Sequence, residues 1–110
     1  MISDTITKIE SRLNSSEAVS DKTRSELLSL LGELKSEVNT LSETHGEDAE
    51  TIAGFAGISA HEATRGTQNP EALKHSIGGL EASVAEFRQS HPKLVTAVNR
   101  VCNALSNLGI

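Results

Sequence analysis

The sequence has almost no aromatic residues. It contains no tryptophan and no tyrosine, and Phe55 and Phe87 are its two phenylalanines. The chain therefore offers no platform on which bases or sugar rings would stack. Because apolar residues make up only 36% of the chain, its core must be built from Leu, Ile, Val and Ala.

Cysteine is nearly absent too, since Cys102 is the only one. A disulfide within the chain and a cysteine-based zinc site are therefore excluded. Cys102 shares a predicted helical face with Val98, Val101 and Leu105, so we expect a small buried hydrophobe and not a nucleophile. The chain also lacks a serine nucleophile elbow and a phosphate-binding glycine loop, so we expect neither an enzyme nor a cofactor.

Basic residues are also outnumbered by acidic ones. The net charge is −5, and it is uneven: residues 1–50 hold 11 acids and 5 bases, whereas residues 51–110 hold 4 acids and 5 bases. A protein that binds a nucleic-acid duplex needs a basic face to neutralise the phosphates. We therefore do not expect nucleic acid to be a partner.

No long apolar run is present. The longest, IAGFAGISA at 52–60, has nine residues, about half of what a membrane-spanning helix needs. The N-terminus, MISDTITKIESRL, lacks the basic stretch followed by an apolar stretch that marks a signal peptide. We therefore expect a cytoplasmic protein with no transmembrane segment.

What the sequence does contain is a repeated spacing of apolar residues by four and then three positions, which is typical of one face of a helix. No alternating strand pattern accompanies it. An average spacing of about 3.5 residues suits rods packed side by side in a bundle. The sequence therefore predicts a single all-α domain over residues 1–110, an antiparallel bundle of four to five helices at about 3–14, 21–45, 48–64, 70–89 and 92–108.

Residues at the expected helix ends support these limits. Ser3 is a suitable N-cap for the first helix, and Gly46 stands where a glycine cap would end the second. Asn69 and Pro70 form a strong start for a later helix, because Asn caps free N–H groups and Pro fits the first helical position.

The segment 47–68 is rich in glycine and alanine and predicts a weak helix or a mobile insertion. Gly54 and Gly57 each cost about 1 kcal/mol relative to Ala inside a helix. Phe55 and Ile58 are candidates for exposed interaction residues, which would dock on a partner protein, a lipid surface or a small apolar ligand.

Pro92 falls inside the most regular apolar pattern of the chain, which runs from Leu73 to Leu108 without losing phase. Proline lacks a backbone donor, and its ring clashes with the carbonyl four residues earlier, so we expect a bend or a break there. The triplet Ser-His-Pro is typical of a new helix start, which favours a break with His91 or Ser90 as the cap.

The C-terminal stretch FRQSHPKLVTAVNRVCNALSNLGI combines a Phe, a Ser-His-Pro triplet, a Leu and a Gly-Ile end. It resembles the ending of a small bacterial family, domain of unknown function 4404, in the residues Phe87, His91, Pro92, Leu94, Ala104, Leu105, Gly109 and Ile110. The leucine-rich stretch 24–41 is similar to the first half of that family. The resemblance implies a small helical protein and no particular activity. We also expect Gly109 to terminate the last helix and Ile110 to fold back onto it.

The histidines raise the question of a metal site. His61 begins the stretch HEATR, but a zinc protease helix needs a second His four residues later, where this chain has Arg65. His45 and His91 lie on apolar faces and would approach each other if their helices were antiparallel neighbours. One alternative is a metal-binding or pH-sensitive pair. The favoured alternative is that each caps a helix end or bonds a backbone carbonyl.

The long apolar faces favour a structural or protein-interaction module without catalytic activity. The second predicted helix is longer than the first and would leave an apolar strip uncovered, which predicts self-association as a homodimer. The alternative function is that of a partner-, lipid- or small-ligand-binding protein that acts through segment 47–68.

Overall fold

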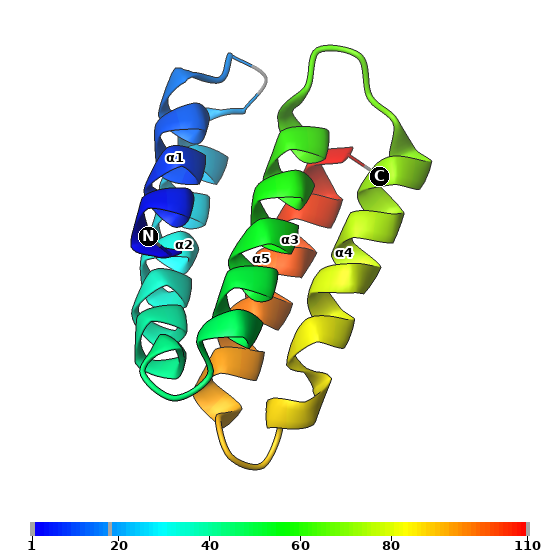
Figure 1. The fold of residues 1–110 in the computed structure, drawn as a ribbon. Helices are drawn as coiled ribbons and strands as arrows, with labels where there is room; N and C mark the ends of the chain where they lie inside the picture. Colours follow the sequence, from blue (N-terminus) through cyan, green and yellow to red (C-terminus); the bar gives the residue numbers. More distant parts are fainter. Residues whose placement is uncertain (1, 18, 110) are drawn as a thin grey trace.

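The computed structural model describes the backbone of residues 2–17 and 19–109 and the side chains of 4–17 and 19–108. This part of the chain forms five α-helices and one short 3₁₀ helix, and it contains no strand (Figure 1). The elements are α1 (Ile2–Ser15), α2 (Asp21–Ser42), α3 (Gly46–Thr64), α4 (Pro70–Val84), η1 (Ala85–Phe87) and α5 (Pro92–Gly109). Consecutive α-helices run in opposite directions, so the predicted all-α antiparallel bundle is confirmed.

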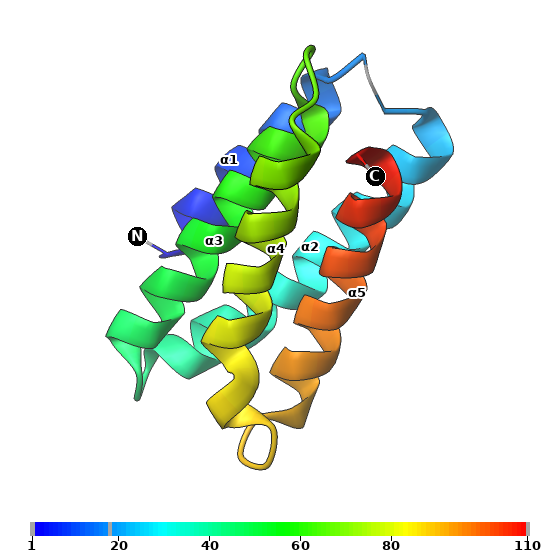
Figure 2. The same cartoon turned by 90° about the vertical axis from the view of Figure 1, so that its right-hand side faces the viewer.

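The helices are arranged in two layers. α1, α3 and α4 form one layer, and α2 and α5 form the other (Figures 1 and 2). α3 lies in the middle of its layer and contacts α1, α2, α4 and α5. The core consists mainly of Leu, Ile, Val and Ala, as the composition predicts. The outer side of the α2 and α5 layer faces solvent.

The helix predicted at about 48–64 within segment 47–68 is present. Residues Gly46–Thr64 form a regular helix of 19 residues, and one side of it is buried in the core. Its buried residues are mostly small: Ala49, Ile52, Ala53, Ala56, Ser59, Ala60 and Ala63. A helix with four helical neighbours needs small side chains so that all of them can approach closely. Tertiary packing therefore outweighs the low helix propensity of the glycines.

Phe55 and Gly79 show how closely α3 and α4 pack. The Phe55 ring lies directly against the Gly79 backbone, so that a Cβ placed at Gly79 would be 2.7 Å from ring atom Cδ1 and 2.8 Å from Cζ. Phe55 is consequently half-buried and packs against the core, in contrast to the exposed position expected for it.

Two helix ends differ from the sequence-based expectation. α2 ends at Ser42, and the N–H groups of Thr44 and His45 bond the Leu41 carbonyl at 3.1 and 2.8 Å. Gly46 is the first residue of α3 and not a left-handed cap of α2, and no described glycine has a positive φ. His45 takes the N-cap position, and its carbonyl accepts from the Ala49 N–H at 2.9 Å.

The first helix begins at Ile2, so Ser3 lies inside it and is not its N-cap. The turn after this helix is held by Arg24 of α2, a role that the sequence did not indicate. Its guanidinium donates to the carbonyls of Leu13, Ser16 and Val19 at 2.9, 2.6 and 3.0 Å. These bonds connect the end of α1 to the start of α2, and Arg24 also bonds Asp21 within α2 at 2.6 Å.

The chain breaks at Pro92, as the Ser-His-Pro triplet predicts. α4 ends at Val84, the short helix η1 follows, and α5 begins at Pro92. The His91 N–H donates to the Phe87 carbonyl at 2.8 Å, and the His91 carbonyl accepts from the Val95 N–H at 3.3 Å. His91 thus closes one segment and opens the next through its backbone.

Both sides of this break serve the same core, since Phe87 and Leu94 are buried. At the other end of the helix, α5 is described as far as Gly109. The expectation that Ile110 folds back onto the helix concerns a residue outside the described part of the chain.

Candidate functional site

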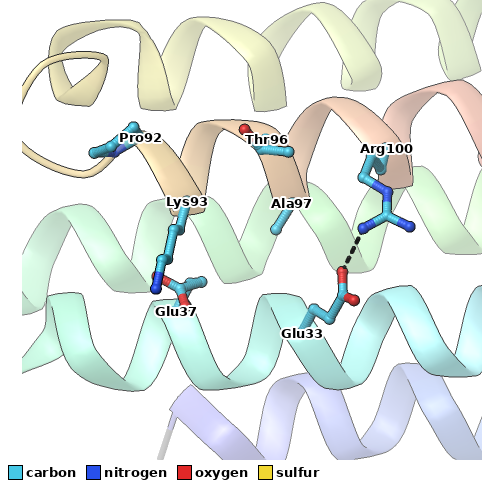
Figure 3. Close-up of a pocket in the computed structure, with 7 residues that line it drawn as sticks. All are labelled: Glu33, Glu37, Pro92, Lys93, Thr96, Ala97 and Arg100. Carbon is cyan, nitrogen blue, oxygen red and sulfur yellow. Dashed lines mark hydrogen bonds and ion pairs between the residues drawn. The ribbon is translucent and has the colours of Figure 1, made fainter.

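The outer side of the two-helix layer carries a groove. It lies between the antiparallel helices α2 and α5 and has a volume of about 350 Å³ (Figure 3). Its lining residues come from both helices: Glu33, Glu37, Pro92, Lys93, Thr96, Ala97 and Arg100. Ala97 is buried and forms part of the floor, while the charged side chains stand at the sides.

The two walls of the groove have opposite charge. α2 contributes Glu33 and Glu37, and α5 contributes Lys93 and Arg100. Arg100 Nη1 bonds Glu33 Oε2 at 2.9 Å across the groove. Almost two turns closer to the start of α5, Lys93 extends towards Glu37 (Figure 3). At both of these positions along the groove, an acidic residue of α2 therefore faces a basic residue of α5.

These charges remain accessible to a partner. The side chains of Arg100 and Glu33 are 55% and 49% exposed. An ion pair that is this exposed contributes about 1 kcal/mol or less to folding stability. Stability alone therefore gives the chain little reason to line this groove with charges.

A second hollow continues the groove along the same face. It has a volume of about 540 Å³ and shares Arg100 with the first. Its other lining residues are Ser25, Glu26, Ser29, Leu30 and Asn103. Glu26 adds a third acid to the α2 side, so the separation of charge by wall extends over several helical turns. We name the surface formed by both hollows the α2/α5 face.

The spacing of these residues in the sequence explains why they share one face. Glu26 and Glu33 are seven residues apart, as are Lys93 and Arg100, and seven residues make almost two helical turns. Glu33 and Glu37 are one turn apart, so both lie on the same side of α2. Their partners are missed because they lie about sixty residues further along the chain.

The candidate interaction residues Phe55 and Ile58 lie on α3, in the other layer. Ile58 is 52% exposed and is the one large apolar side chain among those described that is classed as exposed. Phe55, by contrast, packs on Gly79. The structure therefore does not bring the two together with the α2/α5 face, and it gives them different environments.

Three rings from separate segments meet beside the break at Pro92. His45, Phe87 and His91 pack edge to face, with ring centroids 5.3, 5.5 and 6.0 Å apart. The prediction that His45 and His91 approach each other is thereby confirmed. Nδ1 of His45 bonds the Thr44 hydroxyl at 2.8 Å, and Nδ1 of His91 bonds the Ser90 hydroxyl at 2.9 Å. The arrangement is typical of aromatic packing between helix ends.

Other potential ligands and nucleophiles are held in structural contacts. His61 contacts Arg12 of α1, and Arg65 bonds Glu62 at 2.8 Å, so the charged residues of HEATR pair with their neighbours. No group of three or more His, Cys, Asp or Glu residues that would hold a metal ion occurs in the described part of the chain. Cys102 is buried, and its burial, with a smaller contribution from Glu81, raises the pKa of its thiol to about 12. Such a thiol stays protonated at neutral pH and is a poor nucleophile.

Comparison with known proteins identifies a family. A family model described as Domain of unknown function (DUF4404) matches residues 2–110, so the likeness extends well beyond the C-terminal third. No curated protein and no solved structure matches the chain. Among the described helices, none is both long enough and apolar enough to cross a membrane.

Proposed function

We propose that this chain, which belongs to the DUF4404 family, functions by binding another protein chain through its α2/α5 face. The partner is either a second copy of the chain or a different protein. The role is that of an interaction module without catalytic activity.

The observation that carries the proposal is the separation of charge across the groove. A partner segment that lies along the groove meets carboxylates on one side and cations on the other, with small side chains beneath it. Complementary charges at the edge of an interface set orientation and suppress wrong partners.

Binding rather than catalysis is also supported by the reactive groups of the chain. The Cys102 thiol is buried and held in its protonated form. His45 and His91 use one ring nitrogen each for a neighbouring hydroxyl and pack with Phe87. None of these groups lines the groove.

A second candidate surface lies on α3 around Ile58, where a partner protein, a lipid surface or a small apolar ligand would dock. It is favoured by the exposure of Ile58 and by a hollow of about 220 Å³ beside Gly57, between α1 and α3. One exposed apolar side chain is common on soluble proteins and does not form a patch. The α2/α5 face is therefore the stronger candidate.

Site-specific photocrosslinking tests whether partners bind the α2/α5 face or the surface of α3 around Ile58. A photoreactive phenylalanine analogue replaces Thr96 in the groove, Ile58 on α3 or His75 on α4, whose side chain is 81% exposed in the other layer. In cells that produce the protein, we expect discrete protein adducts from position 96 and none from position 75. Adducts from position 58 alone, or equal adducts from 96 and 75, would contradict the proposal.

A further inference from the structure

Resting on the proposed function, we infer that the chain covering the α2/α5 face is a second copy of this protein, related to the first by a two-fold axis that runs along the groove. The inference deepens the proposed function because it names the partner. It depends on two observations. The two walls carry opposite charge, and the acidic and basic residues lie at the same positions along the groove.

The charges favour a two-fold axis that runs along the groove over one that runs across it. A two-fold axis along the groove places α2 of one copy over α5 of the other, so that acid meets base. An axis across the groove places α2 over α2, so that acid meets acid. Like charges placed opposite one another in an interface repel, whereas opposite charges orient the partners. The α2/α5 face is thus self-complementary in one orientation.

The heights of the charged residues fit the same axis. Rotation about an axis keeps every atom at its own height along that axis. Arg100 and Glu33 of one chain are at the same height, because they are joined at 2.9 Å. Glu33 of the second copy therefore comes over Arg100 of the first, and each Arg100 stands between two carboxylates. The same rotation brings Glu37 of one copy to the level of Lys93 of the other.

The size of the face allows such a contact. α5 has 18 residues and spans about 27 Å. Two helices of about 10 Å diameter span about 20 Å across that length. The face therefore measures roughly 540 Å², so a two-fold contact that covers it involves roughly 1,100 Å² in total, slightly above the ~1,000 Å² expected of a specific interface. Leu30 and Pro92 add apolar surface within the hollows.

A charge swap tests the inference. The variant Glu33→Arg, Glu37→Lys, Lys93→Glu, Arg100→Glu exchanges the signs of the two walls and leaves the net charge unchanged. Opposite charges still face each other within one chain, so the variant is expected to fold, which circular dichroism checks. If it does not, the smaller swap Glu33→Arg, Arg100→Glu replaces it. Association is measured by energy transfer between chains labelled at the N-terminal amine.

We expect the wild type to associate with itself and the swapped chain to associate with itself. Mixed pairs bring acid onto acid and base onto base, so they should form more than about tenfold less tightly. Free mixing of the two chains, or no association of the wild type, would overturn the inference. A wild type that stays monomeric yet still gives adducts with another protein at position 96 would leave the proposed function standing. In that case only the identity of the partner is wrong.

Discussion

Phe55 of α3 packs its ring on the backbone of Gly79 of α4, at a point where a single added carbon would overlap the ring. This contact connects the central helix to its neighbour in the three-helix layer. The adjacent Gly78 has open space where its Cβ would be. A side chain at position 79 would therefore overlap the Phe55 ring, whereas a side chain at position 78 would meet no steric obstacle.

We expect Gly79→Ala to be less stable than Gly78→Ala by about 1–3 kcal/mol, because the new methyl group forces the Phe55 ring out of its place. Gly78→Ala is the matched control and should gain up to about 1 kcal/mol from better helix propensity. Urea denaturation measures both. Adding Phe55→Leu should recover part of the loss in Gly79→Ala, and additive effects of the two substitutions would contradict a direct contact.

Ser59 is fully buried in α3, and its hydroxyl has no hydrogen-bond partner in the described part of the chain. Replacing it with Ala removes a desolvated polar group and improves helix propensity, so Ser59→Ala should raise the free energy of unfolding by about 1 kcal/mol or more. Ser76, also buried, donates to the Leu73 carbonyl at 2.9 Å and serves as the control. Equal gains from Ser59→Ala and Ser76→Ala would show that the missing partner is not the cause.

Arg24 donates to one carbonyl at the end of α1 and to two carbonyls of the turn that follows. Hydrogen bonds from a charged donor contribute about 1.5–3 kcal/mol each at most, so Arg24→Ala should cost about 2–3 kcal/mol in thermal or urea unfolding. Arg24→Lys should restore little of this, because an ammonium lacks the planar fork of donors. Lys35→Ala, which breaks the pair with Glu10 at 2.7 Å, should cost about 1 kcal/mol or less. Full rescue by Lys would contradict the proposed geometry.

Cys102 gives the folded protein a dependence on alkaline pH. Its pKa is raised from 9.0 to about 12 in the folded chain, mainly by burial. The stability that this thiol contributes is therefore complete below pH 9 and is lost as the pH rises towards 12, by at most about 1.4 kcal/mol per pH unit. Urea midpoints of the wild type should fall relative to those of Cys102→Ala across this window. Parallel curves for the two proteins would contradict a protonated buried thiol.

Much of the fold follows from local sequence signals. The four-three spacing places the apolar faces correctly, and Asn69 with Pro70 marks the start of α4, where the Asn69 side chain accepts from the Ala72 N–H. The Ser-His-Pro triplet correctly predicts the break at Pro92. These features are predictable because each depends on residues within one or two helical turns.

The rest depends on contacts between distant residues. The alanines and glycines of α3 look unfavourable in isolation, and only the four surrounding helices make small side chains an advantage. The Arg24 contacts join residues on both sides of a turn that has no motif of its own. The groove is missed for the same reason: its acids come from α2 and its bases from α5, and the sequence alone does not show that these helices are neighbours.

The most direct test of the α2/α5 face as a self-binding surface is the molar mass by sedimentation equilibrium over a wide concentration range. The wild type should rise from the chain mass of 11.7 kDa towards twice that value. The exposed substitution Arg100→Glu, which places acid against Glu33 of both copies, should stay at the chain mass while its circular dichroism is unchanged. A wild type that remains at 11.7 kDa up to about 1 mM, where even a weak interface associates, would contradict the account.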